Sequence, residues 1–143
     1  MSEPVDRLAQ TRASYISSSF DRPEVSPLDL FRTWYDEAAG QVREPNAMTV
    51  STLDDWGPVA RIVLLKAVDT AGFVFFTDYD SAKGRQLAAD PRIAASFPWQ
   101  DMHRQIRIRG LAEAVAAAES DAYFAVRPRG SQIAANVSKQ SQP

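Results

Sequence analysis

Positively charged side chains recur at turns and at the ends of predicted strands in this sequence. The residues concerned are Arg61, Lys66, Lys83, Arg85, Arg127 and Arg129. Taken singly, each is more often a solvated surface charge than a functional group. Taken together they could bind phosphate, because arginine offers a bidentate fork of donors and lysine a compact charge. The hydroxyl groups of Thr77, Ser81 and Ser131 could add further donors.

Apolar segments stand next to these cations and could form the walls of a pocket for a flat ligand. One segment is Ile62-Val63-Leu64-Leu65, and another is Phe75-Phe76. Ligand pockets are mostly apolar and carry a few polar groups that fix the orientation of the ligand. The residues alone therefore indicate a small domain that holds a phosphorylated, partly flat ligand.

Several other kinds of chemistry are excluded by the composition. The 143 residues include no cysteine and one histidine, His103. The absence of cysteine excludes disulfides, thiolate metal sites and cysteine nucleophiles, and a single histidine excludes a metal site built from several histidines. The sequence has no glycine-rich phosphate loop, and we interpret His103 as an exposed residue in a polar connection. We therefore predict no metal site and assign no catalytic residue.

The net charge of −2, from 16 basic and 18 acidic residues, provides no global positive field. Such a field is what holds nucleic acid or an anionic membrane surface, so we predict neither as a partner. No apolar run approaches the roughly 20 residues that a transmembrane helix needs. Residues 1–7 lack the basic and apolar segments of a secretory signal. These features favour a cytoplasmic protein in which local cations meet any bound anion.

Two helices and their caps can be read from the sequence around these cations. Ser26 is a good N-cap, Pro27 suits the first helical position, and apolar residues follow at helical spacing until Gly40. We expect the apolar stripe of this helix to pack in the core. Ser81 predicts a second cap, for a short helix over 82–89 that ends at Asp90-Pro91. A third helix is predicted over 116–126.

Five strands are predicted over residues 47–53, 59–66, 73–77, 93–97 and 105–115. Pro98 is expected to end the fourth strand. In the fifth strand, Gln105, Arg107 and Arg109 should share the face opposite the apolar residues if no bulge intervenes. Strands in hairpin order, with helices as crossovers and lids, predict a small antiparallel barrel of the α+β class.

Five motifs of this sequence occur in an order and spacing typical of one known family. They are Arg61–Lys66, Phe75–Asp78, Phe97–Trp99 with Arg104–Ile106, Arg127–Ile133 and Val137–Ser141. Over the range 12–141 the chain resembles the pyridoxamine 5′-phosphate oxidase family. The resemblance implies an FMN-binding split β-barrel, antiparallel and Greek-key-like, with flanking helices. It also implies a homodimer with FMN at the interface, a mobile N-terminal arm over residues 1–25 and a barrel domain over 26–143.

The resemblance further implies an activity in vitamin B6 metabolism. Pyridoxamine 5′-phosphate or pyridoxine 5′-phosphate would be oxidised to pyridoxal 5′-phosphate, with O2 as the electron acceptor. The flavin would carry the redox chemistry, and the protein would stack and orient two flat rings. Two alternatives remain open: a related split-barrel flavin oxidase of the phenazine-pathway type, and a catalytically impaired fragment that binds FMN or pyridoxal phosphate.

Site residues follow from the resemblance position by position. The residues that match its FMN-binding positions are Arg61, Ile62, Val63, Leu64, Leu65, Lys66, Phe76, Thr77, Lys83, Gln105, Gln140 and Ser141. The residues that match its substrate-binding positions are Lys66, Tyr123, Arg127, Ser131, Arg12 and Tyr15. Arg12 and Tyr15 fall in the arm that would close over the site.

The sequence departs from the family pattern at three places. Ala82 stands where the family commonly has an arginine before the lysine, so we expect one contact to the FMN phosphate to be absent. Asn136 stands where tryptophan is usual, and Ala134 replaces a common glycine. The sequence stops at Pro143, before the C-terminal segment of the family. We therefore expect a C-terminally truncated barrel.

Overall fold

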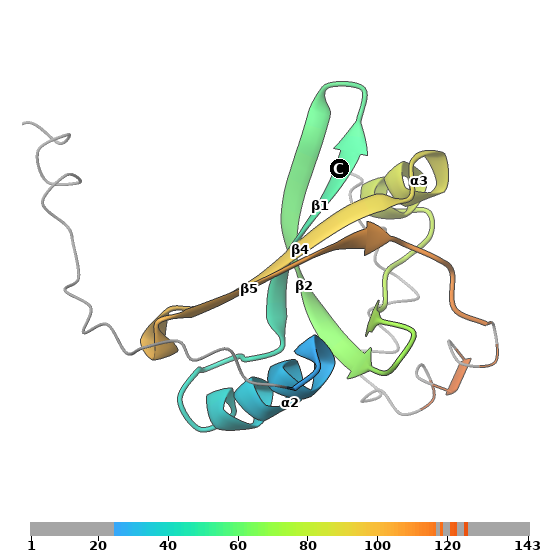
Figure 1. Ribbon diagram of the computed structural model, residues 1–143. Helices are drawn as coiled ribbons and strands as arrows, with labels where there is room; N and C mark the ends of the chain where they lie inside the picture. Colours follow the sequence, from blue (N-terminus) through green and yellow to red (C-terminus); the bar gives the residue numbers. More distant parts are fainter. Residues whose placement is uncertain (1–24, 117, 119–120, 123–124, 126–143) are drawn as a thin grey trace, which may run out of the picture.

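The structure is a computed structural model, and it describes residues 25–116, 118, 121–122 and 125 (Figure 1). Its elements, in chain order, are α2 (Pro27–Ala38), β1 (Ala47–Asp54), β2 (Gly57–Val68), β3 (Phe73–Phe75), α3 (Ala82–Ala89), β4 (Arg92–Trp99), the 3₁₀ turn η1 (Gln100–Met102) and β5 (Arg104–Leu111). The predicted arm, apart from Val25, and most of the predicted third helix lie outside the described residues. None of the helices among the described residues combines the length and the hydropathy of a membrane span.

The five strands form one curled antiparallel sheet in the order β3-β2-β1-β4-β5. The chain makes β1, β2 and β3 as consecutive hairpins, crosses over through α3, and returns to pair β4 with β1 (Figure 1). Three hairpin-linked strands with a fourth lying beside the first make a Greek key, as expected. β3 is two residues shorter than predicted, because its ladder with β2 ends at Phe75.

Helix α2 begins where the sequence predicts. The Ser26 hydroxyl accepts a hydrogen bond from the Asp29 backbone N–H at 3.1 Å, and Pro27 occupies the first turn, where its missing N–H costs nothing. The helix ends at Ala38 with Ala39 as its C-cap, one residue before the expected Gly40. Helix α3 begins after Ser81 and ends before Asp90, as predicted.

Alternating side chains give the sheet two distinct faces. Met48, Val50 and Thr52 on β1 are buried, whereas the residues between them are only half-buried. We call the face that carries these three residues the inner face, and the opposite one the outer face. Because paired residues of neighbouring strands share a face, the register places Arg61 of β2, which pairs with Val50, on the inner face.

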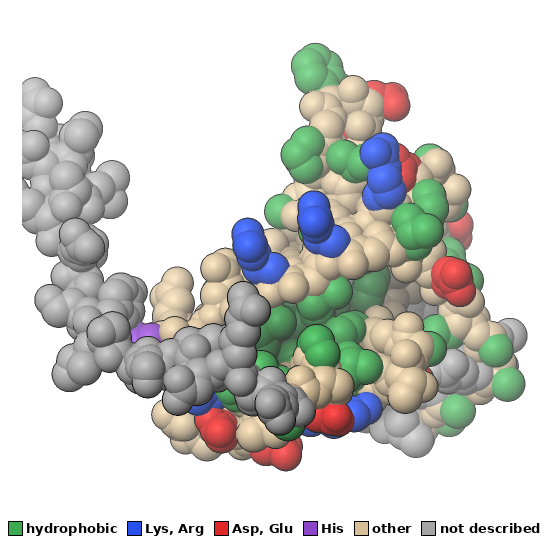
Figure 2. Space-filling model, in the orientation of Figure 1, with side chains coloured by type: hydrophobic (Ala, Val, Ile, Leu, Met, Phe, Trp, Pro, Cys, Tyr) green, Lys and Arg blue, Asp and Glu red, His purple; other side chains and the backbone are tan. Residues whose placement is uncertain are grey.

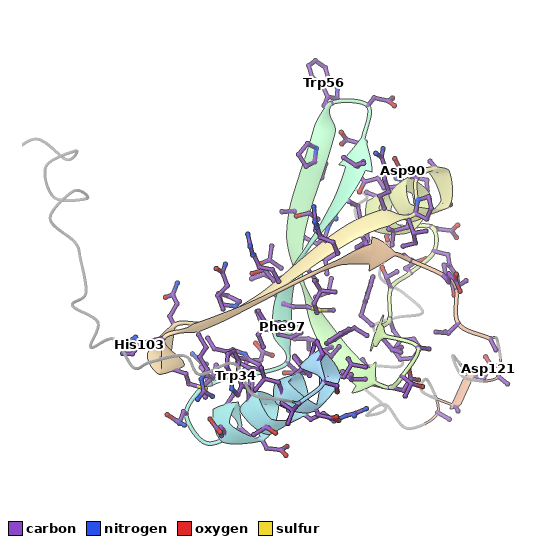
Figure 3. The ribbon with its side chains drawn as sticks, in the orientation of Figure 1. Trp34, Trp56, Asp90, Phe97, His103 and Asp121 are labelled. Carbon is purple, nitrogen blue, oxygen red and sulfur yellow. The ribbon has the colours of Figure 1, made fainter. Side chains whose placement is uncertain are left out.

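The aromatic cluster, made of Phe31, Phe73, Phe97 and Trp99, fills the inner face beneath α2. Phe31 meets Phe73 edge-on at a centroid distance of 4.9 Å, and Phe97 at 5.3 Å. Phe97 and Trp99 are buried, and the Trp99 indole N–H donates to the Pro45 carbonyl at 3.0 Å. Figure 3 shows Phe97 and Trp34 in this region between α2 and the sheet. The cluster fixes α2 on the sheet, as the apolar stripe of that helix predicts.

The prediction that Pro98 ends the fourth strand is wrong. β4 continues to Trp99, and Pro98 pairs with Gln105 of β5. On the other side of β4, pairing with β1 covers only Ala94–Ser96. Pro98 therefore lies beyond that ladder, where proline withholds no ladder hydrogen bond.

Candidate functional site

Helix α3 begins in a tight turn that leaves little freedom to its first residues. The buried Ser81 hydroxyl donates to the Asp78 carbonyl at 2.7 Å and accepts from the Gly84 N–H at 3.1 Å. A Cβ atom at Gly84 would overlap the backbone carbonyl of Tyr79. Only glycine lets the helix approach the preceding turn this closely. The turn therefore fixes the neighbouring residue, Lys83, in place.

Lys83 carries a buried amine. Its side chain is 8% exposed, and its Nζ donates to the Thr77 hydroxyl. Burial lowers the pKa of Lys83 below its usual value, and the nearby positive charge of Arg61 lowers it further, while Asp78 acts in the opposite direction. The site therefore holds a cation in surroundings that disfavour its charge.

Arg61 extends from β2 along the inner face toward α3. One terminal nitrogen, Nη1, donates to the Thr52 hydroxyl at 2.6 Å and to the Val59 carbonyl at 3.1 Å. The other, Nη2, donates to Oε1 of Gln86 on α3 at 2.7 Å. Burial lowers the pKa of Arg61, and Asp54 opposes this shift. Neutral oxygens thus hold the guanidinium between the hairpin and the helix.

We call the group of Arg61, Lys83, Thr77, Thr52 and Gln86 the cationic cradle. No carboxylate of the described residues lies within ion-pair distance of Arg61 or Lys83. Arginines elsewhere do have such partners: Arg92 with Asp90, for example, at 2.5 Å on the surface. Buried cations are usually paired. Two neighbouring cations held only by neutral oxygens form a site suited to an external anion such as phosphate.

The predicted FMN-binding run 61–66 is divided between the two faces of β2. Arg61, Val63 and Leu65 lie on the inner face, and Ile62, which is 72% exposed, lies on the outer face. Leu64 shares the outer face with Ile62. Side chains of the whole run therefore cannot line one surface of a single chain, and only Arg61 joins the cradle.

Lys66 lies at the far end of β2 from the cradle. A bulge in the pairing of β2 with β3 falls between Leu65 and Ala67, and Lys66 itself is exposed. It borders a shallow pocket with Phe31 and Tyr35 of α2. Five residues of extended strand separate Lys66 from Arg61, which corresponds to roughly 16 Å. The strand thus carries two cationic positions rather than one.

Two other predicted flavin contacts occupy different places. Phe76 is half-buried next to Thr77 of the cradle. Gln105 is exposed on the outer face of β5, where its Nε2 donates to the Ser96 hydroxyl at 3.4 Å. Arg107 shares this face, as predicted, because no bulge interrupts the β4–β5 ladder. Gln105 and the cradle therefore lie on opposite faces of one chain.

Figure 2 shows further Lys and Arg side chains on the surface and apolar side chains gathered in the hollow between the strands and α2. Arg85 is exposed and donates to the Asp80 carbonyl, so it stays outside the cradle. His103 is exposed in the connection before β5, as predicted, with a left-handed φ of 52° (Figure 3). It lies at the end of the β4–β5 hairpin, far along the sheet from α3.

Several predicted site residues lie outside the described residues, so their predictions stand as they were made. These are Arg12, Tyr15, Tyr123, Arg127, Ser131, Gln140 and Ser141. The structure adds two residues that the sequence analysis did not identify, Thr52 and Gln86. Gln86 follows Lys83 at a spacing of three, which places both on one side of α3, and that spacing was the available signal.

Comparisons with known proteins identify the family to which the chain belongs. A family model described as "Pyridoxamine 5′-phosphate oxidase" matches residues 35–143. The pyridoxine/pyridoxamine 5′-phosphate oxidase of Bordetella petrii is 52% identical over 140 residues, covering 95% of this chain and 67% of that protein. The protein of the same name from Bordetella avium is 58% identical over 120 residues, covering 82% of this chain and 57% of that protein. The chain thus spans between 57% and 67% of the length of these two relatives.

Solved structures show the same fold. PhzG from Burkholderia lata 383, in complex with tetrahydrophenazine-1-carboxylic acid, superposes with a TM-score of 0.82 at 27% identity, covering 90% of this chain and 65% of that one. A pyridoxamine 5′-phosphate oxidase-related, FMN-binding protein from Nostoc punctiforme PCC 73102 has a TM-score of 0.60 at 14% identity, covering 76% and 62%. The curled sheet is the half-barrel of this split-barrel fold, as predicted. The chain therefore belongs to the pyridoxamine 5′-phosphate oxidase family.

Proposed function

We propose that the protein binds FMN with its phosphate in the cationic cradle and oxidises pyridoxamine 5′-phosphate or pyridoxine 5′-phosphate to pyridoxal 5′-phosphate. The observation that carries the proposal is a pair of cations, the half-buried Arg61 and the buried Lys83, whose partners among the described residues are neutral oxygens. Relatives at about half identity bear the name of this oxidase. O2 is the proposed final electron acceptor.

The residues of the cradle suit a phosphate monoester. Arg61 has already been oriented by Thr52 and Gln86, and the Lys83 amine and Thr77 hydroxyl lie at the start of α3, where backbone N–H groups also favour an anion. When bound, the flavin supplies the acceptor for the two electrons that leave the substrate carbon bearing the amine or alcohol. The chain's own residues bind and orient the reactants, and we assign none of them as acid or base.

A second anion position supports a second phosphorylated ligand. Lys66 lies about 16 Å along β2 from Arg61, next to the apolar side chains of Phe31 and Tyr35. The flavin ring and the substrate ring would lie between these two cations. We assign the substrate phosphate to Lys66, together with Tyr123, Arg127 and Ser131, and closure of the site to Arg12 and Tyr15.

The proposal includes a homodimer with FMN at its interface. Gln105 lies on the outer face and Arg61 on the inner face, so a flavin that meets both needs residues from two chains. The outer face of β2 exposes the apolar side chains of Pro58, Ala60 and Ile62, which a second chain would cover. Gln140 and Ser141 are proposed to reach the same flavin.

The alternative of a phenazine-type oxidase has one observation in its favour. The PhzG structure, which holds tetrahydrophenazine-1-carboxylic acid, shares most of this fold. Its identity of 27% is about half that of the Bordetella relatives, so we place this function second. The third candidate, a fragment that binds FMN without turnover, shares the cradle and differs only in lacking activity.

One experiment separates these functions. Purified protein is mixed with FMN and passed through gel filtration, and the absorbance spectrum of the protein peak is recorded. We expect flavin bands in that peak, at the elution volume of a dimer. The loaded protein is then given pyridoxamine 5′-phosphate, pyridoxine 5′-phosphate or a dihydrophenazine carboxylate, with peroxide and product measured. Turnover of the third compound alone would favour the alternative, and flavin without peroxide would identify a binding protein. A colourless peak would refute the proposal.

A further inference from the structure

Three hydrogen bonds form a closed ring that joins the Arg61 guanidinium to Thr52 of β1 and Gln86 of α3. Nη1 donates to the Thr52 hydroxyl at 2.6 Å, and that hydroxyl donates to Gln86 Oε1 at 2.6 Å. Nη2 donates to the same Gln86 oxygen at 2.7 Å. The ring joins residues of β1, β2 and α3, and Thr52 is 1% exposed. Arg61 is therefore held from two sides before any ligand arrives.

The chemistry of the donors fixes the orientation of the Gln86 amide. A guanidinium can only donate, so the atom of Gln86 that faces Nη2 must be the oxygen. The Thr52 hydroxyl already accepts from Arg61, which leaves its proton free to donate to the same oxygen. All three hydrogen bonds of the ring can form only with the amide in this orientation. Such a closed, partly buried network is expected to be rigid.

The hydrogen bonds by themselves do not explain why residue 86 is an amide. A glutamate at the same place could accept from Arg61 and Thr52 equally well, and it would also neutralise the guanidinium. What the amide changes is charge: it positions the cation without compensating it. The same holds for Lys83, whose partner is the neutral Thr77 hydroxyl. The cradle thus keeps its positive charge for an anion from outside.

We propose that Gln86 is a positioning residue that, with Thr52, aims Arg61 at the phosphate group of the flavin while leaving the arginine's charge uncompensated. The inference rests on the proposed function and deepens it, because it names a phosphate monoester dianion as the group recognised and neutral acceptors as the means. Gln86 acts through Arg61 and is not itself assigned a contact with the ligand.

The test compares Gln86→Glu, Gln86→Leu and a control, Gln41→Glu, which makes the same charge change at an exposed position whose side chain donates to the Glu37 carbonyl. Dissociation constants for FMN and for riboflavin, which lacks the phosphate, are measured with each full-length variant by flavin fluorescence. Thermal unfolding is followed with and without inorganic phosphate.

We expect Gln86→Glu to weaken FMN binding by at least about tenfold, since a carboxylate near the dianion repels it and neutralises Arg61. Its riboflavin affinity and its melting temperature without phosphate should not fall, and stabilisation by phosphate should disappear. Gln86→Leu should weaken FMN binding by a smaller factor, and Gln41→Glu should resemble the wild type.

Other outcomes separate the two proposals. If the wild type binds FMN and Gln86→Glu binds it equally well, the role of Gln86 is refuted and the function stands. Equal losses of FMN and riboflavin affinity in Gln86→Glu would indicate a structural role and would also refute the inference. If the wild type is stabilised by phosphate but binds no FMN, the proposed function fails, and the phosphate response of Gln86→Glu decides the inference. A wild-type protein that binds neither FMN nor phosphate would refute both the proposed function and the role of Gln86.

Discussion

The inner face of the sheet is aromatic at one end and cationic at the other. Beneath α2, the aromatic cluster buries Phe97 and Trp99 almost completely, and the one polar hydrogen of Trp99 is paired with Pro45. Beside α3, the cradle also buries Lys83, but no carboxylate among the described residues serves as its counter-ion. The same strand alternation produces both ends. They differ in whether the described residues complete every interaction, and the end with the uncompensated charge is the one that we propose to bind the flavin phosphate.

β1 connects the two ends and shows how the change is made. Its inward residues run from Met48 through Val50 to Thr52, so the strand passes from apolar to polar within five residues. Thr52 is nearly isosteric with valine, and its hydroxyl has two partners, Arg61 and Gln86. A single oxygen atom therefore marks the boundary between the region that stabilises the fold and the region proposed to bind the flavin phosphate.

The largest effect is expected from breaking the aromatic end. Phe97→Ala should lower the free energy of unfolding by about 3–5 kcal/mol, because it removes a fully buried ring and leaves a cavity among three other aromatic side chains. Urea denaturation followed by far-UV circular dichroism measures the loss. The FMN affinity of the folded fraction should be unchanged. A large loss of that affinity would show that the two ends are not independent.

The converse variant removes the charge from the cationic end. Lys83→Met keeps most of the apolar stem and should weaken FMN binding by about 10–100-fold, the size expected for a charged hydrogen bond. The free energy of unfolding should stay the same or rise, because the buried amine is disfavoured in the free protein. Arg92→Met, which removes a surface cation paired with Asp90, serves as the control. A stability loss without an affinity loss would make Lys83 a structural residue.

A pH titration sharpens the comparison without a mutation. Burial, and to a smaller extent the charge of Arg61, lowers the pKa of Lys83, while Asp78 opposes the shift. Its amine therefore loses the proton at a lower pH than an ordinary lysine. In the proposed site FMN binding needs the charged amine, so the dissociation constant for FMN should increase as pH rises above neutrality, where the phosphate is already a dianion. Riboflavin binding should stay flat over the same range. Parallel curves for the two ligands would contradict this assignment.

The smallest effect is expected at the rim of the aromatic end. Arg104 of β5 contacts two residues of α2. It forms an ion pair with Glu37, and its guanidinium carbon lies 4.6 Å from the centre of the Trp34 ring. These contacts are partly exposed, so Arg104→Met should lower the free energy of unfolding by only about 0.5–1 kcal/mol. Thermal unfolding at low and high salt measures it. FMN affinity should not change, and a tenfold loss would place Arg104 in the binding machinery.

The sequence predicts best those features that depend on neighbouring residues. Ser26 and Ser81 cap their helices by contacts three residues away, and both caps are found. Pro98 misled the prediction, because proline's effect depends on which side of the strand carries a ladder, and only the paired sheet determines that. The Greek-key return of β4 to β1 likewise depends on contacts between distant segments.

The candidate site likewise contains residues that the sequence predicts and residues that it does not. Arg61 and Thr77 belong to motifs that carry the family resemblance, and Lys83 matches an FMN-binding position that the resemblance implies. The structure brings these three together. Gln86 and Thr52 were missed because they meet across 34 positions of sequence. No local sequence pattern predicts such a contact, because the contact arises from the register of β1 with β2 and from the docking of α3.

The close fit at Gly84 has a consequence for the energetics of recognition. With no room for even a methyl group between α3 and the carbonyl of Tyr79, the helix has one way to sit on the turn before it. The backbone that carries Lys83 is thereby ordered during folding. Its conformational entropy is lost at that stage, and not when a ligand binds to the amine. Replacing Gly84 with alanine should displace the start of α3 from that turn and so move part of the entropic cost to the binding step.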